Sequence, residues 1–299
     1  MTFLGKKILE TITYGDVFDY PLKLEEIKKL LIASSGFDFK VIRKETFFLL
    51  AHGLIEQENG FYFLKGRKKI VNLREERKVF SQNKLTIGQK YIRFLKFFPW
   101  IRAVAVTGAI AWDNASEDDD IDWLVITAPK RLWVTRFCLG LTLSILKVRR
   151  SPNQKKSEAK DKICLNMFLT EKTLSIPSLK QSLFTAHEVL QARFVYQRFN
   201  ARALFIKKNS WVKKYLFNGY SVGLGQVGLV NKEKTKEKRP CWLIEKPMDW
   251  LDSTFFLLQT SYMKNRKTIE VIERERAFFH PREMAKEIEA KRRKRFLDL

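Results

Sequence analysis

Cysteine and histidine are both scarce in this chain. The 299 residues include three of each, and neither type clusters: Cys138, Cys164 and Cys241; His52, His187 and His280. A zinc centre or a Ser-His-Asp triad therefore has few side chains from which to form. Widely spaced cysteines, two of them in apolar segments, indicate reduced and buried thiols of an intracellular protein rather than a disulfide framework.

Long hydrophobic runs are also missing. The amino-terminal stretch MTFLGKKILETI lacks the uninterrupted apolar core of a signal peptide. The longest apolar stretch, from Leu132 to Leu146, is too short to span a membrane and contains Arg136. We expect a cytoplasmic protein with no membrane partner.

Positive charge, by contrast, is abundant. There are 57 Lys and Arg residues against 33 Asp and Glu, which gives a formal net charge of +24. Such an excess favours polyanionic partners such as RNA, DNA or nucleotides, although it can also simply solubilise a surface. The apolar content of 45% excludes global disorder, and the length allows two or three domains.

The most informative stretch runs from Val104 to Thr127, VAVTGAIAWDNASEDDDIDWLVIT. A short apolar run ends at Thr107-Gly108-Ala109, and after a polar connection a second apolar run begins with Asp120-Ile121-Asp122. Side chains alternate along a strand, so both aspartates are expected to point to the same side. The preceding acids Asp118 and Asp119 are typical of a solvated loop.

Two neighbouring carboxylates repel each other unless a cation lies between them. Mg²⁺ binds carboxylate oxygens and leaves positions for substrate phosphates, so Asp120 and Asp122 are candidate ligands of Mg²⁺ or Mn²⁺. Gly108 allows the backbone to approach a phosphate closely, and a helix that starts there would direct N–H groups at it.

This order of features resembles the nucleotidyltransferase superfamily that includes DNA polymerase beta, the CCA-adding enzymes and the minimal nucleotidyltransferases. Their pattern is Gly-Gly or Gly-Ser, a spacer, and Asp-x-Asp, with a third carboxylate on a later strand. The resemblance covers about residues 100 to 170. It implies that Thr107, Gly108 and Ala109 bind the nucleoside triphosphate substrate and that Asp120 and Asp122 hold the metal.

The chain departs from that pattern twice. Strict alternation along the strand Ile163–Leu169 groups Asn166 with Cys164 and Phe168, and Asn166 stands where the third carboxylate is expected. Asparagine offers only a neutral oxygen ligand and cannot act as a base. Asp161 and Glu171 would need a β-bulge to reach the site. Ala109 lacks the hydroxyl of the family's serine.

The first 66 residues predict three helices and a hairpin. The turn Asn59-Gly60 lies between two strand-like runs, which is a strong hairpin signal. This order resembles a winged helix-turn-helix domain. Lys40, Arg43 and Lys44 on the third helix suit DNA, whereas Glu56 and Glu58 on the wing oppose it, which favours a packing or docking module.

The remaining segments complete the predicted organisation: a linker helix over 67–99 with a solvated basic face, a core over 100–177, and a mainly helical acceptor-binding region over 178–299. Within that last region we expect His187-Glu188 on a helix surface, a flexible connection from Gly219 to Gly228, and a charged linker from Lys232 to Arg239. The loop from Lys147 to Lys162 is expected to be mobile, and Arg136 to reach outward to the surface. The basic run from Lys291 to Arg295 is a candidate RNA- or DNA-binding tail.

The sequence thus predicts an α+β protein with a mixed-sheet nucleotidyltransferase core, preceded by a winged helix and followed by a mainly helical carboxy-terminal region. The predicted function is a Mg²⁺-dependent transfer of a nucleotidyl group to a hydroxyl of RNA, a protein or a small molecule, with Asp120, Asp122 and Asn166 as catalytic residues. The alternative is a winged-helix, nucleic-acid-binding or antitoxin-like regulator with a degenerate transferase fold. The sequence leaves the oligomeric state open.

Overall fold

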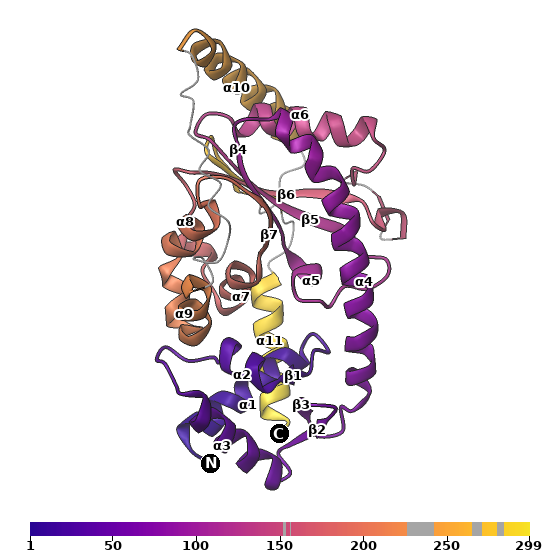
Figure 1. The fold of residues 1–299 in the computed structure, drawn as a ribbon, viewed down its shortest axis with the longest axis vertical. Helices are drawn as coiled ribbons and strands as arrows, with labels where there is room; N and C mark the ends of the chain where they lie inside the picture. The colour runs from indigo at the N-terminus through magenta and orange to yellow at the C-terminus, as the bar shows by residue number, and fades with distance from the viewer. Residues whose placement is uncertain (152–153, 156, 226–241, 265–270, 280–283) are drawn as a thin grey trace.

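A computed structural model describes residues 1–151, 154–155, 157–225, 242–264, 271–279 and 284–299. The chain is a mixed α/β protein built around one mixed sheet (Figure 1). An amino-terminal unit of helices and a small sheet lies at one end of the long axis, and the mixed sheet lies nearer the other.

The amino-terminal unit has the predicted helices and hairpin. Its elements are α1 (Phe3–Asp16), β1 (Leu22–Lys23), α2 (Leu24–Leu30), α3 (Phe39–Ala51), β2 (Ile55–Glu58) and β3 (Phe61–Leu64). The three strands pair in the order β1-β3-β2. The hairpin turn is confirmed at Asn59 and Gly60, whose φ angles of 51° and 80° lie in the left-handed region that Asn and Gly tolerate.

The central sheet has six strands in the order β7-β4-β5-β6-β9-β8. They are β4 (Ile101–Val106), β5 (Ile121–Thr127), β6 (Ile163–Thr170), β7 (Arg193–Gln197), β8 (Val271–Ile272) and β9 (Arg276–Phe278). β4 and β5 are antiparallel, whereas β5 and β6 are parallel and are joined through α6 (Leu132–Ile145). The sheet therefore contains both kinds of pairing.

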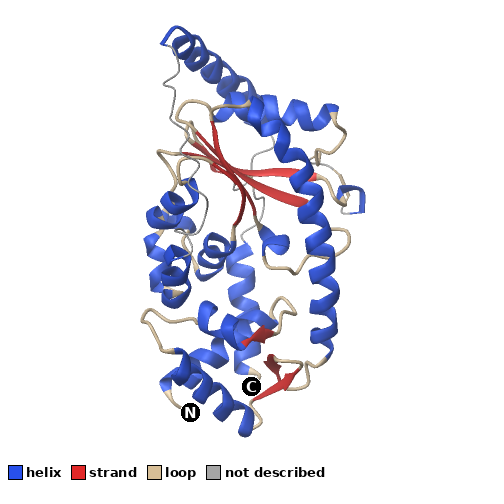
Figure 2. Ribbon diagram, viewed as in Figure 1, coloured by secondary structure: helices blue, strands red, loops and turns tan. Residues whose placement is uncertain are grey.

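Helices cover both faces of this sheet (Figure 2). One face packs against α4 (Lys69–Ile92) and α6, with α10 (Trp242–Met263) lying on α6. The other packs against α7 (Leu183–Gln191), α8 (Ala201–Lys208) and α9 (Phe217–Gly225). No helix in the described part of the chain is both long and apolar enough to cross a membrane.

Side-chain alternation along β5 assigns residues to these two faces. Ile121, Trp123 and Val125 lie in the core on the α4/α6 side. Leu124 and Ile126 lie in the core on the α7/α8 side. Asp122 has the same parity as Leu124, so its side chain faces α7.

Several strands come from the region that was predicted to be helical. β7, β8 and β9 all lie beyond residue 177 and join the central sheet, so the sheet includes strands from the region predicted to be mainly helical. The prediction of a flexible connection at Gly219 was also wrong, because residues up to Gly225 form α9. The predicted linker from Lys232 to Arg239 lies outside the described residues.

The basic residues of α4 are not all solvated, contrary to the prediction for this helix. Arg74 is buried, and its guanidinium lies 2.6 Å from Glu26 Oε1. Lys84, further along the helix, is also buried, and its ammonium lies 2.7 Å from Asp161 Oδ1. Both side chains join α4 to other parts of the molecule.

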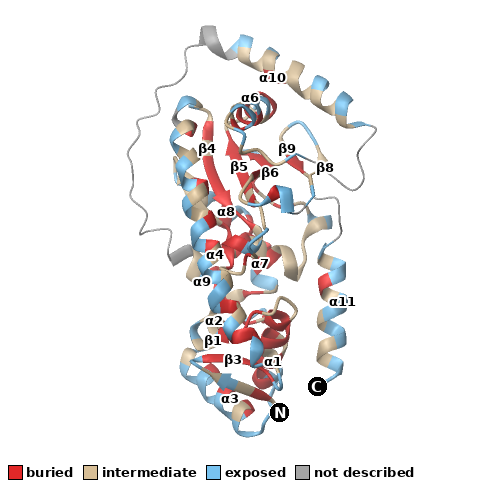
Figure 3. Ribbon diagram, turned by 90° about the vertical axis from the view of Figure 1, so that its right-hand side faces the viewer, coloured by how far each residue is buried: buried red, intermediate tan, exposed pale blue. Residues whose placement is uncertain are grey.

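The carboxy-terminal helix α11 (Met284–Leu297) packs against α7 and α1, so the end of the chain returns to the amino-terminal unit. Arg295 donates to the carboxylate of Asp16, which is buried and also accepts from Arg67 at 2.9 Å. The strands of the central sheet are largely buried, whereas much of α3 and α11 is exposed (Figure 3). Part of the predicted basic tail is thus used in tertiary packing.

Candidate functional site

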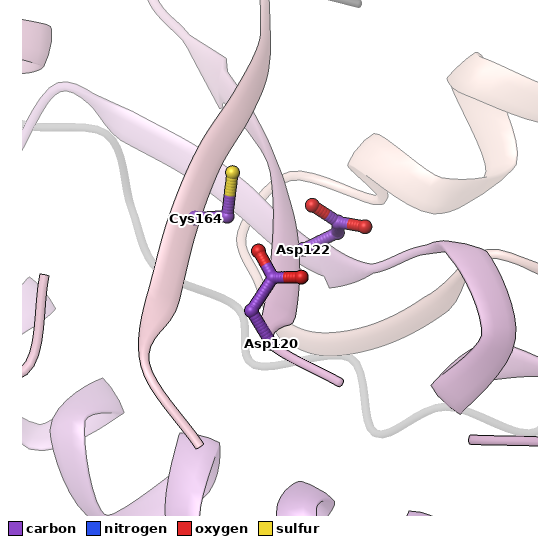
Figure 4. Close-up of side chains that lie close together, drawn as sticks. All are labelled: Asp120, Asp122 and Cys164. Atoms are coloured by element: carbon purple, nitrogen blue, oxygen red, sulfur yellow. The ribbon is translucent and has the colours of Figure 1, made fainter. Parts of the chain in front are cut away.

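Asp120 and Asp122 lie side by side at the start of β5. One carboxylate oxygen of each and the sulfur of Cys164 all lie within 4.8 Å of one another. Figure 4 shows the two carboxylates close together, with Cys164 next to them on the neighbouring strand β6. The predicted same-side placement of the two aspartates is confirmed.

This pair carries more negative charge than its surroundings compensate. The pKa of Asp122 is raised from 3.8 to about 8, mainly by burial and then by the charges of Asp120 and Glu188. Arg150 partly offsets this charge, because its guanidinium lies 2.7 Å from Asp120 Oδ2. Burial and the neighbouring carboxyl groups therefore favour the protonated form of Asp122 below a pH of about 8.

Cys164 acts in this cluster as a thiol. Burial, together with the charges of Asp122 and Asp120, raises the pKa of its thiol well above the ordinary value. The thiol lies close to the Asp122 carboxylate and favours its ionised form, which partly opposes the rise in the pKa of Asp122. Because metal binding by cysteine requires the thiolate, the oxygen atoms are the better ligands here.

The turn from β4 into the short helix α5 (Gly108–Ala111) lies against Asp122. The Thr107 N–H donates to the Asp122 carbonyl at 3.0 Å. Gly108 has a φ of +64°, and a Cβ atom there would lie 3.1 Å from Asp122 Oδ2. Backbone conformation and close approach thus both favour glycine. Ala109 is exposed next to it.

Glu188 on α7 supplies a third carboxyl group to this turn. Its Oε2 accepts from the Gly108 N–H at 3.3 Å, and burial raises its pKa from 4.5 to about 7. The Gly108 N–H and the Trp112 side chain partly oppose this rise in the pKa. Alternation on β5 turns Asp122 toward α7, which explains why two carboxyls distant in sequence meet.

The expectation that His187-Glu188 lies on a helix surface was wrong. His187 is only 1% exposed, and its ring stacks on that of Tyr14 at 4.2 Å between centroids. The available signal was a glutamate within the largely apolar segment LFTAHEVLQ. The helical periodicity of this segment could not by itself reveal that both faces of α7 are covered.

Asn166 contacts Asp122 through its nitrogen. The Nδ2 group donates to Asp122 Oδ1 at 2.9 Å, so the amide orients and stabilises the carboxylate. The predicted strict alternation of β6 was wrong, because the β5·β6 register shifts where Trp123 pairs with Leu165 and Leu124 with Met167. This irregularity places Ile163 and Phe168 in the same core.

The other two acids near β6 do not reach the site. Asp161 pairs with Lys84, and Glu171 lies 3.0 Å from the Arg102 guanidinium. The β-bulge that either would have needed is present, but it lies at the middle of the strand rather than at its ends.

A cavity of about 2000 Å³ opens in front of these residues. Thr107, Gly108, Ala109, Asp122, Asn166 and Glu188 all line it, and Asp120 lies beside it within the carboxylate cluster. Its cationic lining includes Arg136, Arg149 and Arg150. The cavity thus combines an acidic cluster with three arginines.

Arg136 does not reach out to solvent as predicted. It is half-buried, its guanidinium lies 4.4 Å from the Phe279 ring centroid, and it donates to the Gln259 side chain. Burial, with Arg149 nearby, lowers its pKa to about 10. It contributes positive charge to the cavity wall.

The loop after α6 is anchored at its start. Ile163 N donates to Val148 O at 2.7 Å, and Arg150 N donates to Ile163 O at 2.9 Å. This short pairing extends the sheet edge and holds Arg149 and Arg150 at the cavity. Residues 152, 153 and 156 of the predicted mobile loop lie outside the described residues.

No family model, curated protein or solved structure that was compared with this chain matches it.

Proposed function

We propose that the protein is a Mg²⁺-dependent nucleotidyltransferase that uses a nucleoside triphosphate. The observation that carries this proposal is the convergence of Asp120, Asp122 and Glu188 at the Gly108 turn. The cavity of about 2000 Å³ leaves room for both a nucleotide and part of an acceptor.

The residues present fit a divalent cation. Asp120 and Asp122 would hold it, since their oxygens converge and a bound cation would offset the repulsion between the two carboxylates. When bound, Mg²⁺ neutralises triphosphate charge and stabilises the departing pyrophosphate.

Side chains of the protein would bind the triphosphate and accept the proton of the acceptor. Arg150 and Arg149 lie on the cavity wall, where they would bind the triphosphate. The acceptor oxygen attacks the α-phosphorus, the bond from that phosphorus to the pyrophosphate oxygen breaks, and the acceptor proton passes to Glu188. A pKa of about 7 suits a general base at neutral pH.

The proposal is tested by label transfer. The protein is incubated with α-labelled nucleoside triphosphates, Mg²⁺ or Mn²⁺ and candidate RNA, protein and small-molecule acceptors. The Asp120→Asn/Asp122→Asn variant should lose transfer by at least about a hundredfold, since it loses both carboxylate ligands.

Asp118→Asn is the matched control, because Asp118 is exposed in the preceding loop and should leave transfer unchanged. Transfer that persists in the double variant would refute the assignment of the site. So would an equal loss in the control.

A second candidate function, binding of nucleic acid through α3, is favoured by a separate observation. Lys40, Arg43 and Lys44 are exposed on this helix, and none forms an ion pair with a described residue. α1 contacts the rest of the molecule through α11, while α3 lies at the far end (Figure 1). The wing residue Glu58 is compensated by Lys68 at 3.1 Å, which weakens the objection from wing acidity.

This candidate is tested by gel shifts of duplex DNA and RNA in rising salt. Lys40→Ala/Arg43→Ala/Lys44→Ala should weaken binding and flatten its salt dependence by a slope of about three. The charge-matched control is Lys207→Ala/Lys208→Ala/Lys214→Ala, at exposed positions in and after α8. Equal effects of the two triple variants would exclude α3 as a specific surface.

A further inference from the structure

A second cavity borders the carboxy-terminal end of α5. Its volume is about 360 Å³, near the lower end for small-molecule sites. It lies where α2, α5, α7, β7 and α9 meet, and none of its lining groups was predicted to form a site. Trp112 and Ala192 line both cavities, so the two are separated by a thin wall.

Three cations line this cavity: Lys29 from α2, Arg193 from β7 and Arg202 from α8. Burial lowers the pKa of Lys29; nearby Glu26 opposes this, and Arg202 and Arg193 lower the pKa further. Two carboxylates, Glu26 and Asp113, also line the cavity, so the three cations leave a net positive charge that favours an anion.

Lys29 is the cation best placed to receive that anion. Its ammonium forms no hydrogen bond or ion pair with any residue in the described ranges. Glu26, one turn away on α2, is held by Arg74 at 2.6 Å. Arg193 is already paired with Asp113 and with the Ala111 carbonyl.

Unsatisfied acceptors lie in the same wall. Gln191 Oε1 and Asp113 Oδ1 are buried and have no hydrogen-bond partner in the described part of the chain. Buried acceptors are normally satisfied, and those left over often mark a place where a ligand or water donates. Donors such as hydroxyl groups would satisfy both.

Two glycines of α9 line this cavity. A Cβ at Gly219 would lie 2.5 Å from the Lys29 carbonyl oxygen, so only glycine permits this close packing of α9 on α2. At Gly223, one turn later, a Cβ would meet nothing closer than 3.6 Å. Gly219 thus sets the close approach of α9 to α2, and Gly223 leaves its part of the wall without a side chain.

We propose that this second cavity binds a small phosphorylated molecule that carries hydroxyl groups. The phosphate lies against Lys29 with Arg202 and Arg193 nearby, and the hydroxyls donate to Gln191 and Asp113. Occupancy would bear on the first cavity through Trp112, which lines both cavities. Binding itself does not depend on the proposed transferase activity.

Calorimetric titration of the full chain with ribose 5-phosphate in EDTA tests the proposal. The wild type should bind, and Lys29→Met should weaken binding by about tenfold or more, because the methionine keeps the stem but removes the charge. Lys28→Met is the matched control. Lys28 is on the same helix but packs over the Phe39 ring, and it should bind like the wild type.

Two further measurements locate the ligand and check the fold. Asp120→Asn/Asp122→Asn should bind ribose 5-phosphate as the wild type does, which separates this site from the acidic cluster. Lys29→Met should unfold at a temperature no lower than the wild type, since it removes a half-buried charge without an ion-pair partner. Absence of wild-type binding at millimolar ligand, wild-type affinity in Lys29→Met, or lost binding in the aspartate variant would each overturn the proposal.

Discussion

Asp122 has a strongly shifted pKa in the folded protein. Its pKa is about 8 in the folded protein against an ordinary 3.8, because burial and neighbouring carboxyls disfavour its charge. Between these two pH values the folded protein binds more protons than the unfolded chain. The free energy of unfolding therefore falls as the pH rises through this interval.

We expect Asp122→Asn to be more stable than the wild type at high pH, since it removes that penalty. At pH 8 in EDTA the free energy of unfolding should rise by about 1–3 kcal/mol, and near pH 4 the difference should largely disappear. Urea unfolding at both pH values measures this. Asp118→Asn should show no such pH-dependent gain, and a destabilised Asp122→Asn at pH 8 would contradict the expectation.

Thermal denaturation reports on binding of the metal. Mg²⁺ added at pH 8 should raise the unfolding temperature of the wild type, because a ligand that binds only the folded state stabilises it. Asp120→Asn/Asp122→Asn should show no shift, whereas Asp118→Asn should respond like the wild type. Equal shifts in all three proteins would indicate that Mg²⁺ binds elsewhere.

Glu188 is the residue on which the pH dependence of transfer should depend. As a base it must be ionised, so kcat should rise as the pH increases through about 7, its folded pKa. Glu188→Gln should lower kcat by about 10²–10⁴-fold with little change in KM for the nucleotide, and it should lose this rise with pH. A Gln variant that retains the wild-type pH profile would exclude Glu188 as the base.

At the scale of single elements, the β4–α5 turn has the strictest steric requirement in the site. Gly108→Ala introduces a side chain at a φ of +64° and next to the Asp122 carboxylate. We expect a loss of about 1–2 kcal/mol in unfolding free energy, from the left-handed backbone, together with reduced transfer. Thermal unfolding and label transfer measure the two effects.

Ala109→Ser is the control for that variant. Ala109 is exposed, so its replacement by serine should leave the free energy of unfolding within about 0.5 kcal/mol of the wild-type value. If Gly108→Ala proved equally harmless, the turn would not constrain Asp122.

In strand β6, the alternation of apolar residues predicted the strand but not the face on which every side chain lies. The apolar alternation predicted a strand over Ile163–Leu169, and the structure has β6 at Ile163–Thr170. It did not reveal the register shift at Asn166, because a bulge depends on how the neighbouring strand pairs and not on the strand's own residues. The face assignment of Phe168 therefore failed while the strand itself was confirmed.

On the scale of the whole molecule, α11 joins the two ends of the chain. Asp16 is buried and accepts from both Arg67 and Arg295, so its charge is compensated from two distant segments. Removing one partner of a buried ion pair leaves charge without compensation.

We expect Arg295→Met to lower the free energy of unfolding by about 1–3 kcal/mol. This loss is smaller than for a fully buried ion pair, because the Arg295 side chain is 34% exposed and solvent screens its charge. Urea unfolding measures this. Arg293→Met is the control: its side chain is 74% exposed and pairs only with Glu289, so the change should stay below about 0.5 kcal/mol. Equal effects of the two variants would show that the contact with Asp16 does not hold α11.

The sequence by itself determined the features that depend on neighbours along the chain. Asp120 and Asp122 share a side because strand geometry alternates, Gly108 stands at a turn that needs glycine, and Asn59-Gly60 closes a hairpin. Each of these follows from backbone stereochemistry over a few residues.

Only the tertiary structure decided which distant residues share the site. It brought Glu188 to Gly108, added β7, β8 and β9 to the sheet, and surrounded the second cavity with segments from across the chain. These outcomes depend on which faces of the helices are covered and on how strands pair. Both are set by the summed packing of the whole chain, which no local pattern contains.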